Sequence, residues 1–191
     1  VQTCALPILC VNTGTIPSKT FREAVIHLSG FRERGIYGSS YRVKQDISID
    51  DLLYRVQLVV RSEIDVIRNQ MTRNRVELIE STARFVDAHT LELESVGRHG
   101  RREISADKIV IACGTEAARD NHIPFDGQRV FTSDDVLGLQ TLPRSLIVVG
   151  AGVIGVEYAT MFAALGVRVT VVDKRPVLLP FLDHEISAAL T

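Results

Sequence analysis

The part of the sequence that decides the fold is Leu146-Ile147-Val148-Val149-Gly150-Ala151-Gly152-Val153-Ile154-Gly155. An uninterrupted apolar run that ends at a glycine is typical of a strand buried in a parallel sheet. Residues 156–165 then predict a helix, and the β-branched run at 167–172 predicts a second strand. Strand, glycine turn, helix and strand in this order predict a βαβ unit.

The glycines of this loop have separate physical roles. Gly150 permits a tight turn, Gly152 lets the backbone approach a pyrophosphate, and Gly155 lets the helix pack close to the strand. The anion is expected over the N–H groups at the start of the helix, where Val153 and Ile154 stand. The loop therefore predicts a dinucleotide-binding site, and the alternative is a glycine turn that only packs.

An acid with two basic neighbours follows the second strand. Asp173 lies 23 residues after Gly150 and is placed to accept hydrogen bonds from the ribose of NAD. Lys174 and Arg175 come next, and cations can neutralise the 2′-phosphate of NADP. Two alternatives stay open: tolerance of NADP as well as NAD, or basic side chains that are simply solvated.

Composition narrows the class of protein. The chain has 191 residues, of which 46% are hydrophobic and 24% charged, as in an ordinary globular protein. A formal net charge of −1 gives no reason to expect nucleic acid or anionic lipid as a partner, and no apolar run approaches the length of a membrane span. Three scattered cysteines argue against a disulfide framework. We therefore expect a cytoplasmic protein.

The two ends of the sequence suggest a fragment. The first eight residues, Val1-Gln2-Thr3-Cys4-Ala5-Leu6-Pro7-Ile8, resemble one translated frame of a sequencing adapter. We therefore expect residues 1–8 to be non-native, with a genuine apolar strand as the alternative. The sequence also begins without Met and stops at Thr191 within a helical pattern.

Periodicity predicts the remaining elements. A helix is expected from Pro17 to Gly30, a connection over 30–47, and a long helix over about 50–74. Short strands are expected at 76–79, 84–86 and 90–93, and a buried strand at 108–113. The turn-rich segment 115–143 marks the expected domain boundary, so that the first domain covers 9–143 and the second begins at 144.

One further block carries a family resemblance. Residues 10–19 read Cys10-Val11-Asn12-Thr13-Gly14-Thr15-Ile16-Pro17-Ser18-Lys19. The block resembles the redox segment of the pyridine nucleotide–disulfide oxidoreductases, in which a second cysteine occupies the position of Thr15. With threonine there, it looks like the soluble pyridine nucleotide transhydrogenase branch of that family. The resemblance continues at 83–87, 110–114, 132–135 and 150–157.

The resemblance implies an α/β fold of the tandem Rossmann-like FAD/NAD(P)-binding type, incomplete at both ends. Residues 9–143 would then form a partial FAD-binding domain without its first βα unit. Residues 144–191 would start the NAD(P)-binding domain. The resemblance also implies FAD as cofactor, NAD(P)H as substrate, and a homo-oligomer formed through a C-terminal domain outside this sequence. The fragment itself is expected to bind FAD poorly.

Thr15 decides which activity the resemblance implies. A hydroxyl cannot form a disulfide with Cys10, so electrons cannot pass from flavin to a dithiol. What remains is an oxidoreductase that transfers hydride between NADPH and NAD⁺ by way of FAD. One alternative is an oxidoreductase similar to dihydrolipoamide dehydrogenase. Another is a nucleotide-binding flavoprotein without catalytic activity.

The resemblance also implies the residues of the site. Lys19 and Glu157 match a family ion pair beside the flavin and are the expected catalytic residues, the alternative being two unrelated residues near helix starts. Further cofactor contacts are implied for Cys10, Gly14, Thr15, Ala83 and Gly114. Cys113 is expected to be a small buried residue, and no metal site is expected, because no histidine has a suitable companion.

Overall fold

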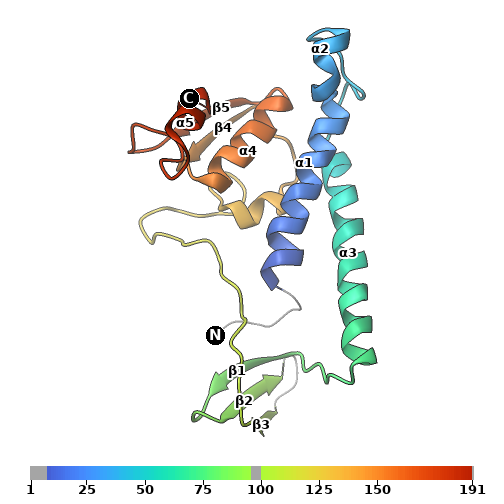
Figure 1. The fold of residues 1–191 in the computed structure, drawn as a ribbon, viewed down its shortest axis with the longest axis vertical. Coiled ribbons are helices and arrows are strands. Elements are labelled where there is room, and N and C mark those ends of the chain that lie inside the picture. The colour runs from blue at the N-terminus through green and yellow to red at the C-terminus, as the bar shows by residue number, and fades with distance from the viewer. Residues whose placement is uncertain (1–7, 96–99, 191) are drawn as a thin grey trace. The chain divides into compact units, whose positions relative to one another are not determined.

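The structure is a computed structural model that describes residues 8–95 and 100–190. The chain forms two compact units (Figure 1). The first contains the described residues of 1–18 and 57–116, and the second contains 19–56 and the described residues of 117–191. The domain boundary expected at 143/144 falls inside the second unit and stays a prediction. Of the segment 1–8, expected to be non-native, residues 1–7 lie outside the described residues, and that expectation stays a prediction.

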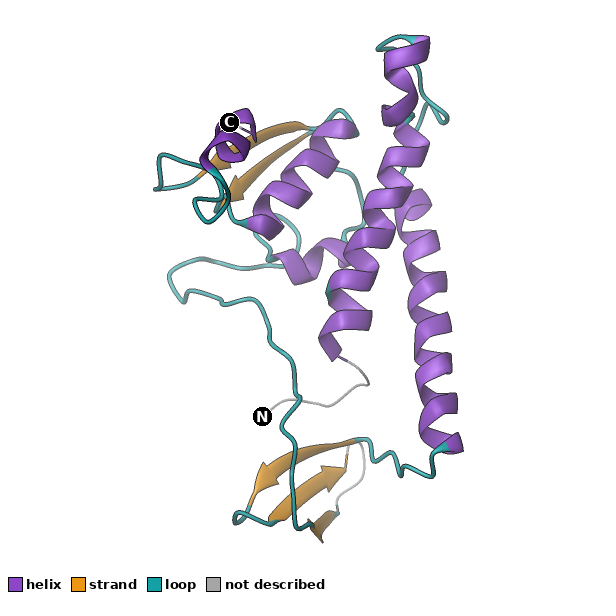
Figure 2. Ribbon diagram, in the orientation of Figure 1, coloured by secondary structure: helices purple, strands orange, loops and turns teal. Residues whose placement is uncertain are grey.

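The first unit contains a small antiparallel sheet. Its strands are β1 (Ser81–Phe85), β2 (Thr90–Ser95) and β3 (Arg101–Ser105), in the order β1-β2-β3. A π-helical segment, η1 (Ile8–Thr13), belongs to the same unit. Figure 2 shows the three strands as one small sheet.

Two predictions about these strands were wrong. The expected strand at 76–79 is not a strand, because the pairing with β2 begins only at Ser81 opposite Ser95. β3 was not predicted, since its sequence Arg-Arg-Glu-Ile-Ser has a single apolar residue and no alternating pattern. In β3, backbone pairing with β2 defines a strand that side-chain periodicity does not reveal.

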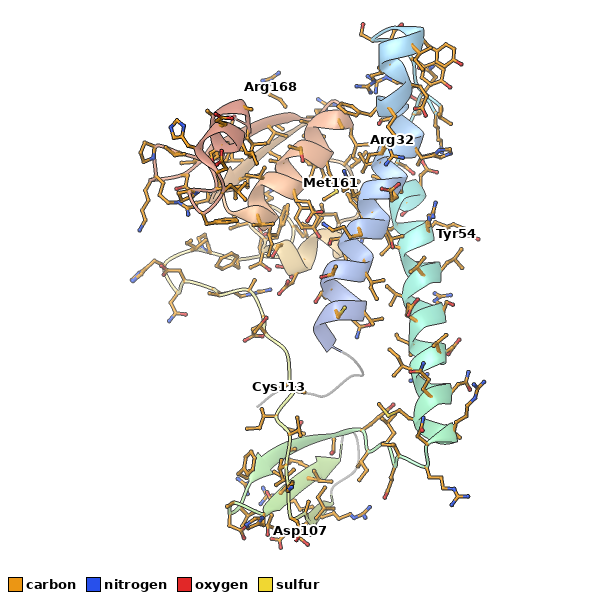
Figure 3. The ribbon with its side chains drawn as sticks, in the orientation of Figure 1. Arg32, Tyr54, Asp107, Cys113, Met161 and Arg168 are labelled. Carbon is orange, nitrogen blue, oxygen red and sulfur yellow. The ribbon has the colours of Figure 1, made fainter. Side chains whose placement is uncertain are left out.

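The buried strand predicted at 108–113 was also wrong. This segment forms no strand, and Val110 and Ile111 are 88% and 72% exposed. A strand needs a hydrogen-bonded neighbour, and in the part of the chain that the structure describes no strand pairs with this segment. Cys113 was expected to be buried but is exposed for the same reason (Figure 3).

The second unit contains the predicted βαβ motif. Strands β4 (Ser145–Val149) and β5 (Arg168–Val172) are parallel, and α4 (Val153–Ala164) connects them. Helix α4 starts three residues earlier than expected, because the first turn includes Gly155, which interrupts the apolar pattern but not the helix. Two shorter helices, η3 (Ser133–Gly138) and α5 (His184–Leu190), flank the motif in sequence.

Two longer helices pass through the second unit. They are α1 (Thr15–Ser29) and α3 (Ile49–Arg73), both close to their predicted bounds. The connection expected over 30–47 contains two short helices, η2 (Phe31–Glu33) and α2 (Arg34–Tyr37).

Aromatic packing joins α1 to α4. The Phe21 ring centroid lies 6.5 Å from that of Tyr158 and 6.2 Å from that of Phe162, and Phe21 and Phe162 are fully buried. Burial raises the pKa of Tyr158 to about 12, since an ionised phenol loses hydration in such a core. The second unit is therefore held by apolar packing between helices that are far apart in sequence.

The start of α3 is capped by side chains. The Ser48 N–H and Oγ–H donate to Asp51 Oδ2 at 2.8 and 2.7 Å, and the Asp51 N–H donates back to Ser48 Oγ at 3.3 Å. Lys44 Nζ also donates to Asp51 Oδ1. These contacts lower the pKa of Asp51 to about 2, with the Lys44 contact first among the causes. The arrangement satisfies N–H groups that a helix leaves free at its start.

We expect Ser48→Ala to lower the free energy of unfolding by about 1 kcal/mol, because the substitution removes the capping hydroxyl. Thermal or urea denaturation of the full-length protein measures the change. Ser62→Ala is the matched control, since Ser62 is exposed in the middle of the same helix. Equal effects of the two substitutions would contradict a capping role for Ser48.

Candidate functional site

The glycine loop between β4 and α4 is closed by backbone contacts. Gly150 has φ of +108°, a conformation that favours glycine, and its N–H donates to the Val172 carbonyl at 2.8 Å. A Cβ added at Gly155 would lie 2.0 Å from the Gly150 carbonyl oxygen. Glycine at position 155 is therefore required for α4 to begin this close to β4.

The start of α4 is open to an anion. Gly152 is the N-cap residue and no side chain caps the helix. The first N–H groups of a helix have no intrahelical acceptor, and the helix dipole places partial positive charge there. Val153 and Ile154 in this turn are each 56% exposed. The loop thus has the charge and the access that a pyrophosphate needs.

Asp173 is bound to the glycine loop. Its Oδ2 accepts a hydrogen bond from the Ala151 N–H at 2.6 Å, and its side chain is only 10% exposed. The Arg175 guanidinium forms a fork on the same carboxylate, with Nε on Oδ1 at 2.9 Å and Nη2 on Oδ2 at 2.8 Å. These donors hold the pKa of Asp173 well below its usual value, with Arg175 as the largest cause, and the pair raises the pKa of Arg175.

The structure identifies the partners of Asp173, which the sequence left open. Arg175 is an ion-pair partner of Asp173 and not simply a solvated cation, whereas Lys174 is exposed. The donor from Ala151 was missed by sequence reasoning, because it is a backbone group that no residue type signals. The spacing of Asp173 and Arg175, two residues apart after a strand, was the signal available for their pairing.

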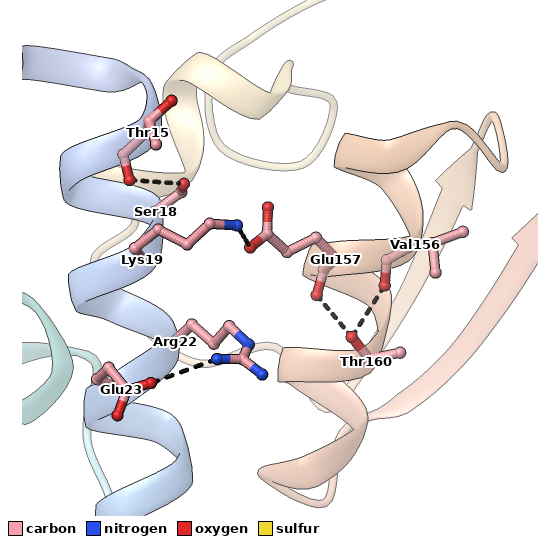
Figure 4. Close-up of polar contacts among 8 residues, drawn as sticks. All are labelled: Thr15, Ser18, Lys19, Arg22, Glu23, Val156, Glu157 and Thr160. Atoms are coloured by element: carbon pink, nitrogen blue, oxygen red, sulfur yellow. Dashed lines mark hydrogen bonds and ion pairs between the residues drawn. The ribbon is translucent and has the colours of Figure 1, made fainter. Parts of the chain in front are cut away.

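The two expected catalytic residues meet in the second unit. Lys19 of α1 donates from Nζ to Glu157 Oε1 of α4, and Figure 4 shows the two side chains pointing toward one another. The Lys19 side chain is 58% exposed and that of Glu157 19% exposed. The ammonium is therefore accessible while its partner is largely enclosed. The catalytic role of the pair stays a prediction.

The other predicted cofactor contacts belong to the first unit. Cys10 is exposed in η1, Gly14 lies between η1 and α1, and Thr15 is the exposed first residue of α1. Ala83 is exposed in the middle of β1, opposite Leu93. Gly114 follows the segment 108–113 and has φ of +71°. Their contacts with a cofactor stay predictions.

The sequence profile described as pyridine nucleotide-disulphide oxidoreductase matches residues 4–191. The chain belongs to this family. The predicted family and its fold are thereby confirmed.

Relatives in this family are similar along most of the chain. It is 54% identical over 182 residues to proteins named soluble pyridine nucleotide transhydrogenase from Mycobacterium tuberculosis and Mycobacterium bovis. It is 39% identical to the protein of that name from Colwellia psychrerythraea. These alignments cover 95% of the chain and 39% of each relative. The chain therefore spans about two fifths of the length of these relatives.

Two solved structures have a similar fold. LpdA from Mycobacterium tuberculosis aligns with a TM-score of 0.82 at 27% identity, over 95% of this chain and 39% of that one. The HOCl-induced flavoprotein disulfide reductase RclA from Escherichia coli, solved as the Cu(II) complex of a mutant, aligns with a TM-score of 0.74 at 27% identity. That alignment covers 95% of this chain and 37% of RclA.

The described residues lack two kinds of feature. Within 8–95 and 100–190, no helix is both long enough and apolar enough to cross a membrane. In the same residues no group of three or more His, Cys, Asp or Glu side chains could hold a metal ion.

We expect Gly155→Ala to destabilise the full-length protein by about 1–3 kcal/mol, because the added methyl group meets the Gly150 carbonyl and the backbone must shift. Gly152→Ala is the matched control, since a Cβ there meets no atom within 4 Å. Thermal denaturation compares the two variants. Equal stability of both would contradict the close contact between Gly155 and Gly150.

Proposed function

We propose that the whole protein is an FAD-dependent pyridine nucleotide transhydrogenase, which transfers hydride between NADPH and NAD⁺. The observation that supports this most directly is Thr15, which stands where disulfide-reducing members of the family have their second cysteine. Cys10 and Cys113 are both free thiols in the structure. The names of the relatives that are 54% identical support the same activity.

The proposed roles of the glycine loop follow from its backbone. The N–H groups at the start of α4 bind the pyrophosphate of a nicotinamide dinucleotide, and Gly152 lets it approach. Asp173 lies at the ribose end of this site. The open, uncapped start of α4 fits such a ligand.

The proposed role of Lys19 is electrostatic. FAD, when bound, supplies the relay that accepts hydride from one dinucleotide and gives it to the other. The exposed ammonium of Lys19, held by Glu157, favours negative charge on a neighbouring ring system. Because threonine replaces the second cysteine at position 15, no disulfide forms there that could accept electrons from the flavin.

The remaining properties are proposals for the whole protein. We propose that it acts in the cytoplasm as a homo-oligomer and binds neither nucleic acid nor membrane. The word "soluble" in the names of its relatives and the near-neutral charge of the chain support this.

We expect the full-length protein to reduce an NAD⁺ analogue with NADPH and to reduce lipoamide at no useful rate. Cys10→Ser should keep most of the transhydrogenase activity, because no step needs the thiol. Absorbance assays of both reactions on one preparation measure this. Cys113→Ser controls for the loss of an exposed thiol as such. Rapid lipoamide reduction, or inactivity of Cys10→Ser alone, would overturn the proposal.

We expect Lys19→Met to lower the midpoint potential of the bound flavin, because the variant loses the cation that favours the reduced form. A loss of about 1.4 kcal/mol corresponds to a shift of about 30 mV in a two-electron couple. Arg22→Met is the matched control, since Arg22 lies one turn further along α1 and contacts Glu23 (Figure 4). Redox titration of the full-length holoenzyme measures both. An equal shift in the control, or none in Lys19→Met, would contradict the role of Lys19.

A further inference from the structure

Arg34 completes the C-terminal end of α1. The last four carbonyl groups of a helix have no partner within that helix. In α1 three of them accept hydrogen bonds from Ser29 Oγ and from the backbone N–H groups of Gly30 and Lys44. The fourth, the carbonyl of Ser29 itself, accepts a hydrogen bond from Arg34 Nη2 at 3.1 Å.

The same nitrogen completes the C-terminal end of α4. The carbonyls of 161–163 accept hydrogen bonds from backbone N–H groups of 165–167. The last carbonyl of the helix, on Ala164, accepts from Arg34 Nη2 at 3.3 Å. One guanidinium nitrogen therefore links the ends of two helices that are far apart in sequence.

Charge and geometry both favour this link. An Nη nitrogen of arginine carries two hydrogens, one for each carbonyl, and helix dipoles place partial negative charge at both ends. The Arg34 guanidinium also lies over the Phe31 ring, with Cζ 5.5 Å from the ring centroid. Its Nε is buried and has no hydrogen-bond partner among the residues that the structure describes. The two carbonyls therefore set the direction of this side chain.

The contacts between α1 and α4 are spaced along both helices. Near the helix starts Lys19 donates to Glu157, and further along the Phe21 ring packs on Tyr158. At a rise of 1.5 Å per residue, Arg34 acts roughly 12 Å beyond Phe21 on α1 and roughly 9 Å beyond Tyr158 on α4. An exposed ion pair holds its partners weakly, so the aromatic contact alone would let the helices turn about it. A second contact at the helix ends fixes their crossing angle.

We propose that Arg34 is a positioning residue for the proposed hydride transfer, because it links the ends of α1 and α4 and thereby aligns Lys19 with Glu157. This inference rests on the proposed function, in which Lys19 lies beside the flavin, and deepens it. Without the link, the angle between the helices varies, and the ammonium spends less time at its place beside the carboxylate.

The first test measures amide hydrogen exchange by mass spectrometry on the full-length holoenzyme. Arg34→Met keeps a long side chain against Phe31 but cannot donate to either carbonyl. Peptides that cover the ends of α1 and of α4 should exchange about fivefold faster, the factor that corresponds to the net contribution of one hydrogen bond. Unchanged exchange at either helix end overturns the link.

The second test determines whether Arg34 acts through Lys19. Midpoint potentials of the bound flavin are measured for Arg34→Met, for Lys19→Met and for the double variant. Arg34→Met should lower the potential by about 14 mV, which corresponds to a threefold change in the equilibrium of a two-electron couple. In the double variant Arg34→Met should add nothing to the shift of Lys19→Met.

A purely structural role for Arg34 would give a different result in this cycle. A general loss of packing around the flavin would act whether or not Lys19 is present, so the two shifts would add. Full additivity therefore overturns the inference, and so does an unchanged potential in Arg34→Met.

Two further variants isolate the link. Arg34→Lys keeps a cation with several N–H donors and should recover part of both effects. Arg32→Met is the matched control, since Arg32 is an exposed neighbour of Arg34 that contacts Glu23 at 3.6 Å (Figure 3). It should leave exchange and potential unchanged. Equal effects of Arg32→Met and Arg34→Met overturn the inference.

Failure of this inference is distinguishable from failure of the proposed function. Transhydrogenation with NADPH is assayed on the same wild-type preparation. In an active enzyme whose potential responds to Lys19→Met, an unchanged potential in Arg34→Met overturns the role of Arg34 alone. Non-additive shifts in a protein that reduces no NAD⁺ analogue support Arg34 and overturn the activity. An unchanged potential in Lys19→Met overturns the roles of both residues.

Discussion

No side chain fits between the start of α4 and the end of β4. The Gly150 carbonyl occupies the place where a Cβ at position 155 would stand, and this close approach fixes where the helix begins. The start of the helix then lies open beside the loop, and Asp173, at the end of β5, reaches the Ala151 N–H. The proposed anion-binding end and the proposed ribose-binding end of the site both depend on this one contact.

Apolar packing sets the position of the Lys19–Glu157 ion pair, which is the second feature of the candidate site. Phe21 of α1 contacts Tyr158 and Phe162 of α4, and it lies two residues beyond Lys19 on the same helix. Tyr158 is adjacent in sequence to Glu157, so the packing that buries the rings also brings the ammonium to the carboxylate. An ion pair this exposed contributes little to stability. Its position at the edge of the core is therefore a consequence of the fold and not a cause of it.

The sequence predicted the βαβ motif and the long helices, because glycine spacing and apolar periodicity act locally. Prediction from the sequence failed where a segment becomes a strand only if a neighbouring strand pairs with it. Residues 108–113 have the composition of a buried strand but pair with none of the described strands, whereas the polar β3 is a strand because β2 lies beside it. In the site, the family resemblance implied Lys19 and Glu157, and the position of Asp173 after the second strand of the glycine-loop unit predicted its place there. The bond from Ala151 could not be predicted, since any residue can donate its backbone N–H.

The exposed segment at 108–113 has a practical consequence. Val110 and Ile111 are apolar and β-branched, and most of their surface faces water. The backbone beside them is a template on which another extended chain can pair, as happens at the open edge of a sheet. Self-association at high concentration is the physical hazard of such a segment. The hazard disappears once another strand pairs with residues 108–113.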